Sequence, residues 1–284
     1  MYTTLIAPAD LAARLDDPNW VILDCRHDLM NPSAGRDGYA GGHIKGAQFA
    51  AIDTDLAGPK TAIDGVFRGR HPLPERAVLI ETLRGWGISP ASQVVAYDAH
   101  GGMFAARLWW MLRWVGHSAV AVLDGGLPAW MAESRPMSTE TPTRERGAIA
   151  EQAPLAATVS AAEVLNNIGS GNKTVIDARS PDRFRGENET MDPVGGHIPG
   201  ARNRFFKDNL QADGRFKSAG QLRADFAPLV SDPANTIMQC GSGVTACHNL
   251  LALEVAGMPG AALYPGSWSE WCADPARPVA TGAS

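Results

Sequence analysis

The chain has 284 residues, of which 45% are hydrophobic and 19% are charged, and its formal net charge is −5. This composition is typical of a globular protein with one large domain or two domains of medium size. The small negative charge argues against a broadly basic protein that binds nucleic acid or an anionic membrane surface. The longest uncharged stretch, 233–253, contains Gln239, Ser242 and Asn249 and is too polar to cross a bilayer.

Short β-rich runs alternate with helical patterns along the first half of the chain. The predicted helices and strands of this half are, in chain order, helix 9–15, strand 20–24, helix 74–86, strand 93–97, helix 104–115 and strand 119–123. In the second half, a buried strand over 236–239 is followed by a helix over 246–256. This alternation predicts an α/β fold with a mainly parallel sheet flanked by helices. Such sheets bind ligands at the carboxyl ends of their strands.

The second half of the chain repeats the first. The matching segments, in the same order, are Val21–Arg26 with Val175–Arg179, Gly41–Ala47 with Gly195–Ala201, Val94–Asp98 with Ile237–Cys240, and Leu123–Gly126 with Tyr264–Ser267. Repetition of this kind predicts two domains of one fold that arose by duplication.

The segment between the two copies has the composition of a linker. It contains Pro136, Pro142 and Pro154, many Ser, Thr and charged residues, and no aromatic residue. We therefore predict a first domain over 1–135, a linker over 136–154 and a second domain over 155–284.

Cys240 lies where the strand over 236–239 ends and the next helix has not yet begun. The intervening residues, Gly241–Thr245, include two glycines that let backbone amides turn inward, and the start of a helix adds positive potential. Such a loop favours a thiolate and an anion bound beside it. The first copy has Asp98 at the matching position, so we predict that the first domain is catalytically inactive and the second is active.

Three other uses of a cysteine fit the pattern less well. A Cys-based phosphatase needs an arginine six residues after the cysteine, where this chain has Ala246. A cysteine protease needs a partner histidine, and His248, on the following helix, is expected to be a packing or surface residue. A zinc site is not expected, because Cys247 and His248 are adjacent and face different ways on a helix. Sulfur transfer remains, in which a thiolate takes up a sulfane sulfur and becomes a persulfide.

The four cysteines form no CxxC pair and no disulfide framework, which is typical of a protein in a reducing compartment. The first twenty residues lack the layout of a signal peptide, so we expect a cytoplasmic protein. We also predict no cofactor and no metal, because the cysteine itself can carry the transferred group.

The loop Cys240–Ala246 resembles the active-site loop of two-domain rhodanese-like sulfurtransferases of the 3-mercaptopyruvate sulfurtransferase type, and the resemblance covers nearly the whole chain. It includes both Gly-His-Ile-x-Gly-Ala turns and the segment Gly266–Trp271. The resemblance implies two tandem rhodanese-like domains with the active site in a cleft between them. In thiosulfate-type members this loop resembles Cys-Arg-Lys-Gly, with two cationic residues after the cysteine. This chain has Gly241 and Ser242 at those two positions.

The resemblance also implies roles for individual residues. It makes Cys240 the nucleophile and persulfide carrier, with Ser242, Asp53 and His71 as a proton relay and Arg183 as the partner of the substrate carboxylate. The other substrate-binding residues that we expect are those of the loop, Gly241, Gly243, Val244 and Thr245. The expected partners are a small anionic sulfur donor and an acceptor such as thioredoxin, a small thiol or cyanide, with no nucleic acid and no membrane.

One position departs from the family pattern. Where mercaptopyruvate enzymes carry a second substrate arginine, this chain has Asp192, which would remove half of a carboxylate clamp and add repulsion. Arg185, Arg202 or Arg204 could compensate. Thiosulfate therefore stays open as an alternative sulfur donor. A non-catalytic role, in sulfide sensing or protein binding, is the alternative to sulfur transfer itself.

Overall fold

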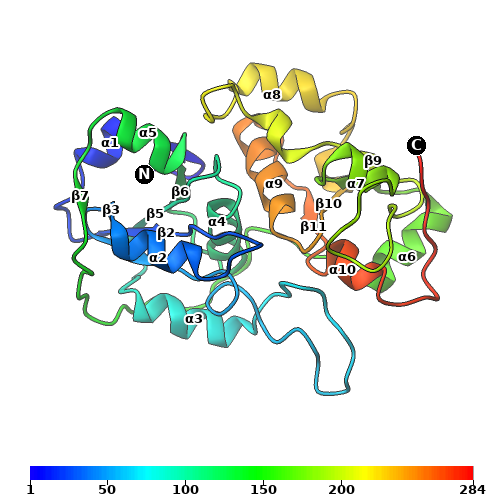
Figure 1. Cartoon of the computed structure of the whole chain (residues 1–284), viewed down its shortest axis with the longest axis horizontal. Coiled ribbons are helices and arrows are strands. Elements are labelled where there is room, and N and C mark those ends of the chain that lie inside the picture. Colours follow the sequence, from blue (N-terminus) through cyan, green and yellow to red (C-terminus); the bar gives the residue numbers. More distant parts are fainter. Residues whose placement is uncertain (284) are drawn as a thin grey trace. The chain divides into compact units, whose positions relative to one another are not determined.

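Parallel β-sheets form the centre of both halves of the computed structural model, which describes residues 1–283 (Figure 1). The chain divides into two units. Unit 1 comprises Met1–Ala57, Pro74–Leu155 and Leu210–Phe216, and unit 2 comprises Gly58–Leu73, Ala156–Asn209 and Lys217–Ser284. Each unit therefore consists mainly of one half of the chain and includes one short segment from the other half. The predicted domains, 1–135 and 155–284, are each continuous in sequence and therefore do not include these two exchanged segments.

Unit 1 contains a five-stranded parallel sheet with the strand order β1-β6-β5-β2-β4. Its strands are β1 (Leu5–Ile6), β2 (Trp20–Asp24), β4 (Ala47–Phe49), β5 (Gln93–Tyr97) and β6 (Val120–Leu123). The strands β2, β5 and β6 are buried at every residue, as is typical of parallel strands covered by helices on both faces. A short antiparallel pair joins β3 (His43–Ile44) to β7 (Met137–Ser138). The helices of this unit are α1 (Pro8–Ala12), α2 (Ala34–Gly41), α3 (Arg76–Gly85), α4 (Ala105–Trp114) and α5 (Gly126–Ala132).

Unit 2 contains a four-stranded parallel sheet with the order β11-β10-β8-β9. Its strands are β8 (Thr174–Asp177), β9 (Arg202–Asn203), β10 (Thr236–Gln239) and β11 (Ala262–Leu263). Its α-helices are α6 (Ala161–Ser170), α7 (Pro181–Arg185), α8 (Ala219–Phe226), α9 (Thr245–Val255) and α10 (Ser267–Trp271), with the short 3-10 helices η1 (Phe206–Asn209) and η2 (Pro233–Asn235). Capping boxes at Ser160 and Ser218 stabilise the starts of α6 and α8, each by about 1 kcal/mol.

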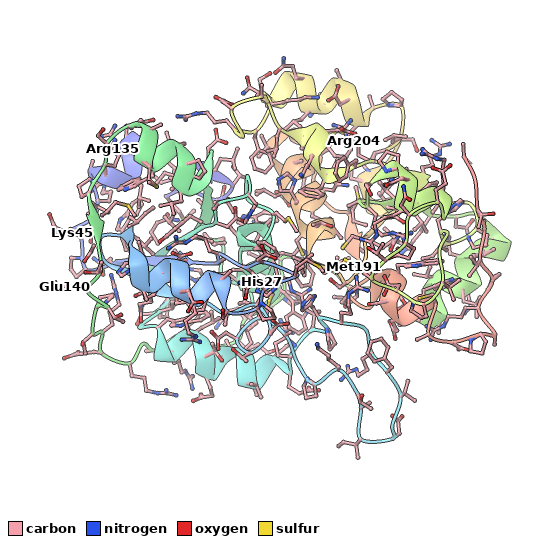
Figure 2. All side chains as sticks on the ribbon, in the orientation of Figure 1. His27, Lys45, Arg135, Glu140, Met191 and Arg204 are labelled. Carbon is pink, nitrogen blue, oxygen red and sulfur yellow. The ribbon has the colours of Figure 1, made fainter. Side chains whose placement is uncertain are left out.

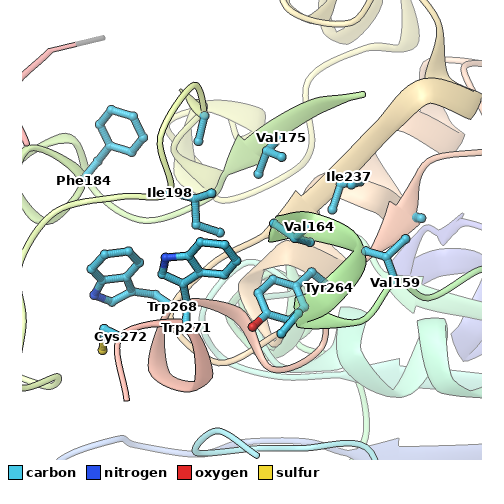
Figure 3. Packing of buried hydrophobic residues seen from close by; sticks show 13 residues of the cluster. Val159, Val164, Val175, Phe184, Ile198, Ile237, Tyr264, Trp268, Trp271 and Cys272 are labelled. Atoms are coloured by element: carbon cyan, nitrogen blue, oxygen red, sulfur yellow. The ribbon is translucent and has the colours of Figure 1, made fainter. Parts of the chain in front are cut away.

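The core of unit 2 brings aromatic side chains of α10 against the sheet. Trp268 and Trp271 are fully buried and belong to one cluster with Val175 of β8 and Ile237 of β10 (Figure 3). The indole nitrogen of Trp268 donates to the carbonyl of Val194, 2.9 Å away. The core thus holds the start of α10 beside the end of β10, where Cys240 follows.

The two sheets share one local geometry at the Asp-x-Arg motifs. The Arg26 guanidinium pairs with Asp24 at 2.6 Å and donates to the carbonyl of Gly42, and Arg179 pairs with Asp177 at 2.6 Å in the same way. In the sheet register, Asp24 lies opposite Tyr97 and Asp177 lies opposite Gln239. The predicted α/β fold with parallel sheets and helical flanks is confirmed.

Each copy of the repeat also contains one small hairpin. A bridge joins Thr61 to Phe67 in the first copy, and a bridge joins Leu210 to Phe216 in the second. Both hairpins turn at an Asp-Gly pair, and Gly65 and Gly214 have φ values of 83° and 80°, which suit glycine. The hairpin of the first copy belongs to unit 2, and the hairpin of the second copy belongs to unit 1. The exchange of segments is thus reciprocal and involves equivalent parts of the repeat.

Most predicted elements agree with the observed ones to within two residues at each end, and the strands over 20–24, 93–97 and 236–239 agree at both ends. The helix predicted over 9–15 is shorter, Pro8–Ala12, and buries only Pro8 and Leu11. No helix within residues 1–283 is long and apolar enough to cross a membrane.

Candidate active site

Cys240 follows β10 directly and is buried, with 2% of its surface exposed. Its amide donates to the hydroxyl of Ser267 at 3.1 Å, and its carbonyl accepts from the amide of Trp268 at 2.9 Å. Gly243 has a φ of 76°, and a Cβ at this position would lie 2.3 Å from the carbonyl oxygen of Pro265. The loop can therefore take this shape only with glycine at 243, and the start of α10 fixes the backbone of the cysteine.

The equivalent loop of unit 1 shows what such a loop binds. Asp98 follows β5 as Cys240 follows β10, and its carboxylate accepts four backbone N–H bonds of 2.7–2.9 Å. The four donors are the amides of His100, Gly102, Phe104 and Ala105. This loop is an anion-binding nest, and the chain fills it with a carboxylate of its own. That carboxylate supports the prediction that the first domain is inactive, because a second anion in the same place would be repelled.

The loop after β10 carries a thiol where the loop after β5 carries a carboxylate. By alignment of Asp98 with Cys240, the four amides correspond to those of Ser242, Val244, Ala246 and Cys247. The two backbones differ in part, because Gly102 has a φ of 92° whereas Val244 has a φ of −89°, and the amide of Cys247 donates to the carbonyl of Val244 at 3.1 Å. A negative sulfur attached to Cys240 would lie at the start of α9, whose first residue is Thr245 and whose positive end favours an anion.

The segment Gly58–Leu73 brings His71 to this loop within unit 2. The Nδ1 atom of His71 lies 2.8 Å from the Oγ atom of Ser242, and both side chains are buried. Two residues of the predicted relay are therefore within hydrogen-bond distance. Asp53, the third, belongs to unit 1, where its carboxylate lies 3.9 Å from Nε2 of His27 (labelled in Figure 2). Burial lowers the pKa of His27, against the opposing charge of Asp53.

Two guanidinium groups face the backbone of Gly241. A Cβ built on Gly241 would lie 2.7 Å from Nη2 of Arg70 and 3.7 Å from the guanidinium nitrogens of Arg183. Arg70 comes from the same segment as His71, and its amide donates to the hydroxyl of Ser269 at 3.1 Å. The absence of a side chain at 241 therefore leaves room for an arginine delivered from a distant part of the sequence.

The three arginines that we expected to compensate for the missing family arginine make contacts elsewhere. Arg185 pairs with Glu187, Arg202 donates to the carbonyl of Pro228, and Arg204 pairs with Asp225. These contacts hold the three side chains elsewhere, and the second guanidinium near Gly241 is that of Arg70. One feature of the sequence could have indicated Arg70, namely its position directly before His71, which we had predicted to lie in the site.

Asp192 contacts both guanidinium groups near Gly241. One of its carboxylate oxygens accepts from Nη1 of Arg70, and the other lies 3.4 Å from Nη2 of Arg183. The carboxylate therefore bridges the two arginines. Met191, labelled in Figure 2, marks the loop that carries this residue.

Asp192 belongs to a continuous series of ion pairs, which we call the ion chain. Its members, in order of contact, are Asp177, Arg179, Glu189, Arg183, Asp192 and Arg70. Burial opposes ionisation of Glu189, but hydrogen bonds from Arg183 and from the amides of Met191 and Asp192 outweigh it and hold its pKa below the usual value. The ion chain thus carries alternating charge from the end of β8 to the catalytic loop.

Comparison with known proteins places this geometry in a family. The rhodanese-like domain matches residues 7–133 and 160–274. A Pseudomonas aeruginosa protein named "probable 3-mercaptopyruvate sulfurtransferase" is 47% identical over 98% of this chain and 98% of its own length. The thiosulfate sulfurtransferase of Mus musculus is 33% identical over 100% of this chain and 97% of its own length.

A solved structure agrees with the fold. The 3-mercaptopyruvate sulfurtransferase from Leishmania major superposes with a TM-score of 0.83 at 31% identity, covering 95% of this chain and 74% of that one. The chain therefore belongs to the rhodanese-like family, as an enzyme with two such domains in tandem whose relatives are sulfurtransferases.

Proposed function

We propose that this enzyme moves a sulfur atom from 3-mercaptopyruvate to a thiol or to cyanide through a persulfide on Cys240. The observation that carries the proposal is the contact between His71 and Ser242, which are 2.8 Å apart and buried, with Ser242 in the loop that begins at Cys240. A donor that arrives as a thiol needs a group that moves its proton, and a histidine-serine pair supplies one. The relative from Pseudomonas aeruginosa supports the same donor.

The first half-reaction balances with one proton transfer. The Cys240 thiolate attacks the sulfur of mercaptopyruvate, a sulfur–sulfur bond forms, and the carbon–sulfur bond breaks. The electron pair of the broken bond leaves as the enolate of pyruvate. The proton of the substrate thiol reaches the enolate carbon through Ser242 and His71, with Asp53 as the third member of the relay. The products are pyruvate and the negatively charged persulfide.

The loop and the two arginines have separate tasks in this reaction. Arg183 and Arg70 bind the carboxylate of the donor, because planar guanidinium groups match carboxylate oxygens. We expect the loop residues Gly241, Gly243, Val244 and Thr245 to surround the outer sulfur of the persulfide, at the start of α9, where the positive end of the helix favours an anion.

The second half-reaction returns the enzyme to its thiolate. An acceptor such as thioredoxin, a small thiol or cyanide attacks the outer sulfur, and the Cys240 thiolate leaves. Cyanide becomes thiocyanate, and a thiol becomes a persulfide. We also propose a cytoplasmic location, since the four cysteines are unpaired and a reducing compartment keeps the nucleophile free.

Steady-state transfer to cyanide tests the proposal when 3-mercaptopyruvate and thiosulfate are compared at equal concentration. We expect kcat/KM for mercaptopyruvate to be at least tenfold higher, which corresponds to about 1.4 kcal/mol of transition-state free energy. Cys240→Ser should abolish transfer from both donors. Cys25→Ser is the matched control, because burial raises the pKa of the Cys25 thiol well above its usual value and leaves it unreactive. Retained turnover in Cys240→Ser would contradict the proposal.

Thiosulfate is the second candidate donor. The two guanidinium groups at Gly241 favour it, since they resemble the paired cations expected beside the thiol of a thiosulfate enzyme. Its reaction transfers the sulfane sulfur to Cys240 and releases sulfite with no proton transfer. A higher kcat/KM for thiosulfate than for mercaptopyruvate would identify thiosulfate as the donor. Ser242 would then have no role in proton transfer.

A further inference from the structure

The ion chain has a part that both units share and a part that only unit 2 contains. Its first pair, Asp177 with Arg179, repeats the pair of Asp24 with Arg26 in geometry. A pair that occurs in both copies serves the fold, because only one copy carries the thiol. The extension by Glu189, Arg183, Asp192 and Arg70 reaches the backbone of Gly241. This extension is therefore the part that acts on the substrate.

Asp192 is the member of the extension that holds both substrate-facing arginines. Its side chain is 3% exposed, whereas those of Arg70 and Arg183 are 20% and 19% exposed. The amides of Met191 and Asp192 donate to Glu189, at 2.9 and 3.1 Å, so that the backbone of this loop is also fixed. The carboxylate of Asp192 is buried and orients two guanidinium groups that remain partly open to solvent.

The extension is electrically neutral, because two carboxylates balance two guanidinium groups. A carboxylate donor with one negative charge needs directional N–H donors, which both arginines still supply. A donor with two negative charges needs uncompensated positive charge to offset its loss of hydration, and the extension has none. The same two carboxylates repel a dianion more strongly than a monoanion.

We propose that Asp192 is a specificity-determining residue, which orients Arg70 and Arg183 and cancels their charge so that the site selects a monoanionic carboxylate donor over a dianionic one. The inference rests on the proposed function, since it concerns the choice between the two donors of that reaction. It assigns to Asp192 a positioning and charge-setting role without contact to the reacting sulfur.

The test is the donor preference of Asp192→Asn. This variant keeps the size and one acceptor oxygen of the side chain and gives the extension a charge of +1. We expect the ratio of kcat/KM for mercaptopyruvate to that for thiosulfate to fall at least tenfold. Sulfate should also become a tighter competitive inhibitor, while inhibition by acetate changes little. Glu187→Gln is the matched control, because it removes an exposed carboxylate that pairs with Arg185, and we expect it to leave the ratio unchanged.

Two further variants keep the proposal testable if Asp192→Asn folds poorly. Arg70→Gln gives the extension a charge of −1 and should lower thiosulfate use more than mercaptopyruvate use. The double variant Arg70→Gln/Asp192→Asn is neutral again and should restore the sulfate inhibition of the wild type. An unchanged donor ratio in Asp192→Asn, or a proportional loss of both donors in Arg70→Gln, would overturn the inference.

The failure of this inference differs from a failure of the proposed function. If the wild-type enzyme transfers sulfur from mercaptopyruvate and the variants keep its donor ratio, the function stands and the role of Asp192 falls. If the wild type uses neither donor, the function itself falls.

Discussion

The Nδ1 atom of His71 lies 2.8 Å from the Oγ atom of Ser242, although the two residues are 171 positions apart in the sequence. The pair forms because the segment Gly58–Leu73 belongs to unit 2, with the catalytic loop, and not to the unit that contains most of its half of the chain. A buried histidine and hydroxyl in the loop of the proposed nucleophile can move a proton only for a donor that carries one.

Substitution of Ser242 should therefore affect the two donors differently. In Ser242→Ala we expect kcat for mercaptopyruvate to fall about 100-fold, because the enolate must be protonated without the relay. Turnover of thiosulfate should change much less, since that reaction transfers no proton. Steady-state kinetics with both donors measure the effect, and thiosulfate turnover serves as the internal control for folding. An equal loss with both donors would assign Ser242 to the binding of the persulfide instead.

Substitution of Gly241 should weaken donor binding without unfolding the protein. A Cβ at 241 would lie 2.7 Å from Nη2 of Arg70, and the flexible end of that side chain can move away. We expect Gly241→Ala to raise KM for the carboxylate donor about tenfold and to leave the thermal midpoint nearly unchanged, because one charge-assisted contact is lost. Gly220→Ala is the control, as no atom lies within 4 Å of its Cβ position. A normal KM in Gly241→Ala would mean that Arg70 does not bind the donor.

Substitution of Glu189 should make the stability of the protein less dependent on pH. Hydrogen bonds from Arg183 and two amides outweigh burial and hold the pKa of Glu189 below its usual value. A lowered pKa contributes stability that is present above the unfolded-state pKa and is lost as the pH falls through the folded-state pKa.

At pH 7, Glu189→Gln should lower the free energy of unfolding by about 3 kcal/mol, because the buried Arg179 and the partly exposed Arg183 both lose a partner. The difference from the wild type should shrink as the pH falls below about 4, near the ordinary pKa of glutamate. Denaturant titrations at several pH values measure it. A difference that stays constant from neutral to acidic pH would show that the charge of Glu189 is not the cause.

Separation of the two halves of the chain should destabilise both units. Unit 1 includes Leu210–Phe216, whose Phe216 amide donates to Asp124 at 2.8 Å, and unit 2 includes Gly58–Leu73. Fragments 1–154 and 155–284, produced separately, each lack one of these segments from their unit. We expect each fragment alone to unfold at lower denaturant concentration than the intact chain, and the two to recover sulfur transfer when produced together.

The control for the fragments is the intact protein cleaved within the linker after it has folded. Both segments are then already in place, and activity should persist. A fragment as stable alone as the intact chain would show that the exchanged hairpin contributes nothing to its unit.

The fold class and the duplication could be read from the amino-acid sequence alone, and the same patterns predicted Cys240 as the nucleophile. These depend on local features: apolar runs of strand length, glycines where the loop must turn, and the replacement of Asp98 by Cys240 at the end of equivalent strands. Such features act through residues that are neighbours in the chain, so a linear pattern records them.

The side chains that meet at the loop of Cys240 could be identified only from the tertiary structure. From the sequence pattern we predicted that Asp192 repels the carboxylate of the donor and that Arg185, Arg202 or Arg204 could compensate. In the structure, Arg70 comes from the first half of the chain and pairs with Asp192. The effect of a charged side chain depends on the charges that lie near it, and these are set by the packing of segments far apart in sequence. The residue types were readable from the chain, but the placement of Gly58–Leu73 in unit 2 decided their partners.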